Sequence, residues 1–240
     1  MPVKSRKSFT RRPRTGGRRK PLVVKLARQV KFLRKSMPER KAVSTGLINA
    51  TFSLAGSFAL LNSVRVGDNS WQREGKNITF SRMSILGHIT LTGDATATGS
   101  DFCRMLIVHD KQTNGAIFSY ASLLANIANG GASTSTVYTQ RNVNNMRRFT
   151  ILFQKQFSRP PIGAAGTVAT VSNNYSQLHG DTGYNPMVRS SKKISVKTVY
   201  EADAGTVADI TRGSIYLLCI GLYAAPQYQF EGQIRFNYVD

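Results

Sequence analysis

The sequence has few of the residues from which catalytic and metal sites are usually built. Among 240 residues there are three histidines, which are scattered, and two cysteines, Cys103 and Cys219. Each cysteine sits inside an apolar run, 116 positions from the other, and there is no CxxC motif or Cys/His cluster. We therefore expect two buried free thiols and neither a disulfide nor a zinc site.

The motifs of the common enzyme classes are also missing. There is no phosphate-binding loop ending in Gly-Lys-Ser/Thr, no GxSxG elbow and no HExxH pair. "HDKQTNG", which starts at His109, is interpreted as a turn, because Asp, Asn and Gly each favour turn geometry. Asp94 and Asp101 flank a loop of small residues without the dense oxygen ligands of a calcium loop. The sequence predicts no enzymatic activity, no cofactor and no bound metal.

Long apolar segments are lacking as well. The N-terminus has no apolar stretch typical of a secretory signal, and the uncharged segment "GSIYLLCIGLYAAPQYQF" is interrupted by Gly, Pro and Gln. We therefore expect no membrane-spanning helix.

Acidic residues are nearly absent from the N-terminal region. Residues 1–41 contain sixteen Lys and Arg but one acid, Glu39, which gives +15, whereas the other 199 residues carry +6. Such a segment repels itself and has little to bury, so it is expected to meet a polyanion or a receptor for basic peptides. The asymmetry predicts a basic arm, over residues 1–43, attached to an ordinary globular body.

The arm has two parts. Residues 1–20 are rich in Arg and are broken by Pro13 and the Gly16-Gly17 pair. Over about 21–37 the spacing predicts an amphipathic helix, with a basic opposite face, that Pro38 should end. Its apolar stripe consists of Leu22, Leu26, Val30, Leu33 and Met37. Two interpretations stay open: a helix that packs its stripe on the body, or one that forms when its basic face meets nucleic acid or lipid.

Residues 44–240 have a β pattern. Runs rich in Val, Ile, Thr, Phe and Tyr alternate with Gly, Asn, Asp and Ser clusters. We predict strands at 51–61, 78–92, 102–109, 148–157, 193–200, 214–223 and 229–238, an eighth at 135–139 or 167–171, and one helix in "SYASLLANIAN". Long connections and the lack of a βαβ rhythm favour an all-β fold, an antiparallel eight-stranded sandwich of the jelly-roll type.

The arm carries the main functional signal. Polycationic segments bind nucleic acid by neutralising phosphates and releasing counterions, which requires no fixed geometry. Base stacking by Phe9, Phe32 or Trp71 is a further option, although packing is the favoured role of Trp71. The predicted nucleic-acid contacts are Lys4, Arg6, Lys7, Arg11, Arg12, Arg14, Arg18, Arg19, Lys20, Lys25, Arg28, Lys31, Arg34, Lys35, Arg40 and Lys41.

Three blocks suggest a family. They are "LLNSVRVGDNSWQREGKNITFSRMSILGHITLTG", "CRMLIVHDKQTNGAIFSYASLLANI" and "NVNNMRRFTILFQKQF", with Arg73-Glu74-Gly75-Lys76-Asn77-Ile78 and Arg148-Phe149 as their markers. In this order, behind a basic arm, they resemble the capsid proteins of small circular single-stranded DNA viruses that encode a separate replication initiator. The C-terminal "GQIRFNYVD" is similar to the last strand of geminivirus-like coat proteins.

The resemblance implies a viral jelly roll that self-assembles, as a homo-oligomer of sixty copies, into a small icosahedral (T=1) shell. It further implies an arm that faces a packaged single-stranded DNA genome, a nuclear localisation signal read by a host import receptor, and a protein found in the virion and, during assembly, in the host nucleus. Contact with a membrane through residues 21–37 is left open. The alternatives are the capsid protein of a small single-stranded RNA or satellite virus and a cellular β-sandwich that binds nucleic acid.

Overall fold

The computed structural model describes residues 26, 29, 40–91, 101–124, 137–159, 187–222 and 228–240. The chain divides into two units, Met1–Pro38 and Glu39–Asp240. In the first unit the described residues Leu26 and Gln29 are helical and exposed. The amphipathic helix over 21–37 as a whole stays a prediction.

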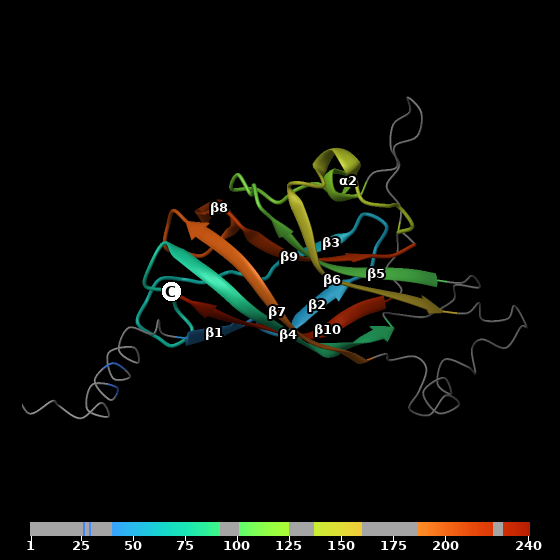
Figure 1. The fold of residues 1–240 in the computed structure, drawn as a ribbon. Coiled ribbons are helices and arrows are strands. Elements are labelled where there is room, and N and C mark those ends of the chain that lie inside the picture. Colours follow the sequence, from blue (N-terminus) through green and yellow to red (C-terminus); the bar gives the residue numbers. More distant parts are fainter. Residues whose placement is uncertain are drawn as a thin grey trace, which may run out of the picture. The chain divides into compact units, whose positions relative to one another are not determined.

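The second unit is built from two antiparallel sheets (Figure 1). The larger sheet has the order β1-β10-β4-β7-β8, and β2 also pairs with β10. The smaller sheet has the order β3-β9-β5-β6. The strands are β1 Arg40–Ser44, β2 Ile48–Thr51, β3 Ser57–Leu60, β4 Asn77–Leu91, β5 Asp101–Asp110, β6 Phe149–Arg159, β7 Met187–Tyr200, β8 Ile210–Arg212, β9 Ser214–Ile220 and β10 Tyr228–Val239.

The strand order is that of a jelly roll. We count β1 and β2 as one strand, leave out the three-residue β8 and number the remaining eight strands in chain order. The larger sheet then contains strands one, eight, three and six, and the smaller contains strands two, seven, four and five. The chain thus crosses repeatedly between the sheets, as in two interlocked Greek keys. The predicted fold class is confirmed.

Most predicted strands are confirmed, with three corrections. The missing strand is β1 with β2, so the predicted boundary of the arm at residue 43 falls inside a strand of the body. The strand predicted at 51–61 contains only the last residue of β2 and the whole of β3, which belong to different sheets and are separated by a turn at Gly56, whose φ is 75°. β7 begins at Met187 rather than at 193. Residues 137–139 form no strand, and the other candidate, 167–171, lies outside the described residues.

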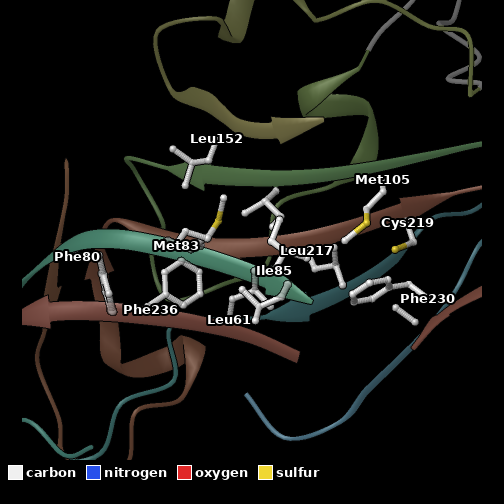
Figure 2. Packing of buried hydrophobic residues seen from close by; sticks show 14 of the residues in the cluster. Leu61, Phe80, Met83, Ile85, Met105, Leu152, Leu217, Cys219, Phe230 and Phe236 are labelled. Atoms are coloured by element: carbon white, nitrogen blue, oxygen red, sulfur yellow. The ribbon is translucent and has the colours of Figure 1, made fainter. Parts of the chain in front are cut away.

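The main core fills the space between the two sheets. Figure 2 shows Phe80, Met83 and Ile85 of β4 opposite Met105 of β5 and Leu217 of β9, with side chains from both sheets meeting in one apolar layer. Their burial follows from the alternation of inward and outward residues along each strand.

The two cysteines contribute to this core. Cys103 and Cys219 are both free and buried, as predicted. Burial raises the pKa of the Cys219 thiol far above its usual range, because a thiolate is poorly solvated there.

A second apolar cluster covers the outer face of the smaller sheet. The described parts of the connection between β5 and β6, residues 111–124 and 137–148, cover this face, with helix α2, Tyr120–Leu123, at the top in Figure 1. Phe118, Leu124 and Val137 pack there against Tyr216 and Leu218 of β9. This explains why every residue of β9 is buried: its two faces lie in two different cores.

The helix predicted in "SYASLLANIAN" begins at Tyr120, and residues 125–130 of that segment lie outside the described part. No helix among the described residues is long and apolar enough to cross a membrane.

Candidate nucleic-acid interface

The outer face of the larger sheet is strongly basic. Alternation along its strands turns apolar residues into the core and polar ones outward, for example Val188 inward and Arg189 outward on β7. The outward cations come from five strands and are Arg40, Arg82, Arg189, Lys193, Lys197, Arg212 and Arg235.

The register brings these cations into neighbouring rows. In one row, Arg82 of β4 is paired with Lys193 of β7 on one side and Asn237 of β10 on the other. In the next row, Thr79 separates Lys197 from Val239, which is paired with Arg40 of β1. Adjacent strands lie about 4.8 Å apart, so positive charges from distant parts of the sequence gather on one surface.

The cations of this face are not paired with carboxylates of the described residues. None of the seven forms an ion pair with such a carboxylate. Arg235 donates from Nε to Ser44 Oγ at 2.8 Å instead. The acid that the described strands place on this face is Glu231, which lies 3.5 Å from His88 Nε2 and accepts from Thr90 Oγ1 at 3.1 Å. The face therefore has a positive potential that attracts anions.

A hollow opens in the middle of this basic face. Its volume is about 500 Å³, and its lining residues are Arg40, Lys41, Ala42, Ser81, Arg82, Lys193, Asn237 and Val239. It lies where β4 is irregular. The pairing of β4 with β7 changes register between Phe80 and Arg82, and the pairing of β10 with β4 changes register between Asn237 and Tyr238. Bulges of this kind re-aim side chains.

Comparison with known proteins adds little to this geometry. No family model and no curated protein matches the chain. Among solved structures, it is similar at 10% identity to VP1 of the trichodysplasia spinulosa-associated polyomavirus, determined in complex with sialylated glycooligomers, with a TM-score of 0.23 over 83% of this chain and 92% of that one.

A second similar structure is that of T=1 particles derived from infectious bursal virus. It also has 10% identity, with a TM-score of 0.15, over 85% of this chain but only 40% of that chain. At these scores the fold assignment rests on the strand order described above, and the function has to be argued from the site.

The structure describes two of the sixteen predicted nucleic-acid contacts. Arg40 is exposed at the start of β1 and lines the hollow. Lys41 also borders the hollow, but its side chain is on the inward side of β1 and the residue is 4% exposed, with its Nζ 2.6 Å from Glu74 Oε1 and 3.8 Å from Asp240 Oδ2. Two carboxylates thus already compensate the charge of Lys41, and its contact with nucleic acid stays a prediction. The other fourteen predicted contacts lie outside the described residues.

The cations of the strands were not predicted as contacts from the sequence. The net charge of residues 42–240 is only +6, and the sequence does not show that its cations gather on one surface. The alternation of Lys193, Ser195 and Lys197 predicts one outward face of β7, but only the strand order shows that Arg82 and Arg235 share that face.

Trp71, for which packing was expected, is 48% exposed in the loop before β4. Phe9 and Phe32 lie outside the described residues.

The remaining polar candidates have structural roles. The turn predicted at "HDKQTNG" is confirmed, with Asn114 and Gly115 at φ values of 52° and 69°. Within the described ranges, no three His, Cys, Asp or Glu side chains come together in a way that suits a metal ion. Asp94 and the side chain of Asp101 are not among the described parts.

Proposed function

We propose that this protein is the structural subunit of a small icosahedral viral shell and that it packages single-stranded nucleic acid. The observation that carries the proposal is the basic face of the larger sheet, whose cations pair with no carboxylate of the described residues, together with the basic arm that continues along the chain into β1. The arm ends at β1, and β1 is itself a strand of that sheet. The two sets of cations are thus covalently contiguous.

The two sets suit different kinds of binding. The arm neutralises phosphates without fixed geometry, and its charge density makes binding strong and sensitive to salt. The sheet face holds its cations on a rigid scaffold, so it restricts where the bound strand runs. Sixty arms of +15 would supply about 900 positive charges, the right order for a genome of roughly one to a few thousand nucleotides.

The resemblance to capsid proteins of circular single-stranded DNA viruses supports DNA as the packaged nucleic acid. It also supports a nuclear localisation signal in the arm, read by a host import receptor. Single-stranded RNA would satisfy the same electrostatics, because phosphate contacts carry no sequence information. The type of nucleic acid is therefore decided by experiment.

The test is electron microscopy of the purified full-length protein, followed by extraction and nuclease digestion of bound nucleic acid. We expect uniform particles of about 1.6 MDa, which is sixty times 26.4 kDa, containing DNase-sensitive material. RNase-sensitive material would replace the DNA assignment with RNA. A protein that stays monomeric at high concentration would contradict the shell and leave a cellular nucleic-acid-binding β-sandwich.

Deletion of residues 1–20 tests the arm. We expect the body to fold, with an unchanged unfolding midpoint, while the nucleic acid per particle falls sharply. A matched control replaces the cations of this segment by Gln at the same length, which separates charge from chain length. Normal nucleic-acid content in either variant would contradict a packaging role for the arm.

A further inference from the structure

We propose that the hollow on the basic face is a defined binding site for the phosphate group of a nucleotide, one per copy of the chain. The proposal rests on the proposed function for its biological ligand, the packaged strand. It goes beyond that function because neutralisation of phosphates requires no particular position on the protein, whereas we assign one phosphate to a defined position.

The first observation is the irregularity of β4 at Ser81. In a regular strand, neighbouring residues point to opposite faces of the sheet. Here Ser81 and Arg82 are both exposed, because the register with β7 and with β10 shifts at this point. The bulge thus brings a hydroxyl and a guanidinium to the same face, where a regular strand would turn one of them into the core. Bulges are frequent beside functional sites for this reason.

The second observation is a pair of like charges. Arg82 and Lys193 are registered directly opposite each other on β4 and β7. Like charges at directly opposite positions destabilise a sheet. No carboxylate of the described residues forms an ion pair with either. A bound phosphate between them would turn the repulsion into two attractive contacts.

The third observation is the chemistry of the remaining lining. Arg40 adds a third cation from β1, and Asn237 adds an amide beside Ser81, whose Oγ donates to the Asn237 carbonyl at 3.2 Å. Ala42 and Val239 supply apolar surface. A volume of about 500 Å³ lies within the range of about 300–1,000 Å³ typical of small-ligand sites. The hollow can therefore hold more than a bare phosphate and suits a phosphate with its sugar.

The same chemistry is offered by a phosphate within a strand and by a free nucleotide. The test therefore uses three ligands on the full-length protein, purified free of nucleic acid in high salt: inorganic pyrophosphate, thymidine monophosphate and a ten-residue oligothymidine. The measurement is the rate of acetylation of each lysine, followed by mass spectrometry. Lys193 lies in the hollow, and Lys197, exposed on the same strand but outside it, is the internal control.

We expect the ligand to slow acetylation of Lys193 about tenfold at ten times the Kd, since the unoccupied fraction falls to about one tenth. Lys197 should be much less affected. Arg82→Gln should abolish the protection, and Arg189→Gln, on the same face outside the hollow, should leave it. Protection by the oligonucleotide alone assigns the site to strand phosphates, and protection by all three ligands assigns it to phosphates of either source.

Equal protection of Lys193 and Lys197 would overturn the proposal in favour of diffuse binding over the face. The proposal would also be overturned if none of the three ligands protected Lys193. The comparison of the two lysines needs no variant, so it is valid even if Arg82→Gln fails to fold. It is also independent of assembly: a protein that forms no shell yet shows selective protection of Lys193 refutes the shell but not the site.

Discussion

The guanidinium of Arg73 lies over the ring of Tyr200, 4.3 Å from its centroid, and is 1% exposed. It donates from Nε to the Val64 carbonyl at 3.0 Å, and its two terminal nitrogens donate to the carbonyls of Gly75, at 2.8 Å, and Ala202. One side chain thereby connects the loop before β4 with the loop after β7. Its charge is stabilised by carbonyl dipoles and an aromatic face.

Arg73→Lys should destabilise the body by about 3 kcal/mol, because an ammonium cannot reach three carbonyls in a fork and leaves buried acceptors unpaired. The measurement is the urea midpoint of unfolding. Arg65→Lys, at an exposed position of the same loop, is the control and should change little. An unchanged midpoint for Arg73→Lys would show that the fork does not stabilise these loops.

Asp110→Asn should be similarly destabilising, by about 3 kcal/mol. The Asp110 carboxylate is fully buried at the end of β5 and accepts from Arg148 Nε at 2.8 Å and from its terminal nitrogen at 2.7 Å. Removing its charge leaves Arg148 partly buried without its partner. Thermal unfolding is the measurement, and Asp68→Asn on the exposed loop before β4 is the control. Equal melting temperatures for the two variants would refute the prediction.

Stability should fall when the solution is acidified below about pH 6.5, and His109 should account for part of the loss. Burial, with Lys111 nearby, lowers the pKa of His109 from 6.5 to about 4. Between these values the unfolded chain binds a proton that the folded chain does not, so acid favours unfolding. His109→Gln should flatten this part of the stability curve when urea midpoints are compared between pH 7 and pH 4. His88→Gln, at an exposed position, is the control, and an unchanged curve for His109→Gln would contradict the assignment.

Lys193→Glu should separate stability from binding. The new carboxylate would face Arg82 directly, which should stabilise the sheet by about 0.5 kcal/mol at low salt. The same change should weaken binding of oligothymidine and reduce its salt dependence. Lys197→Glu, which faces Thr79, should weaken binding without the stabilisation. Loss of stability in Lys193→Glu would indicate that the two cations do not repel each other in the folded protein.

The strands that the sequence predicts well are those with regular alternation. Most of β4 and all of β10 show it, because one face of each lies in the core and the other faces outward. β1 falls within the predicted arm because that arm is defined by the charge of residues 1–41, and the strand itself is short and carries Lys41 at an inward position, where alternation predicts an apolar residue. The carboxylates of Glu74 and Asp240, which come from distant parts of the chain, lie beside Lys41 Nζ and compensate a lysine there.

The basic face could not be predicted for a related reason. Its charges are contributed singly or in pairs by separate strands, and the sequence does not show which strands are neighbours. The alternation in "NITFSRMSILGHITLTG" is imperfect. β4 pairs with β7 and β10 on both sides of the irregularity, which is the bulge at Ser81. A local defect in a pattern was thus the sign of the hollow.

The two sheets differ in whether their outer faces are covered by other parts of the chain. The smaller sheet is closed by the connection that contains α2, whereas the larger one presents its cations. About 10 Å of packed core separates the two sheets. In the shell that we propose, if all copies share one orientation, substitutions in the covering connection would remodel one surface without altering the charge of the other. The sandwich therefore gives the chain two surfaces that selection can change independently.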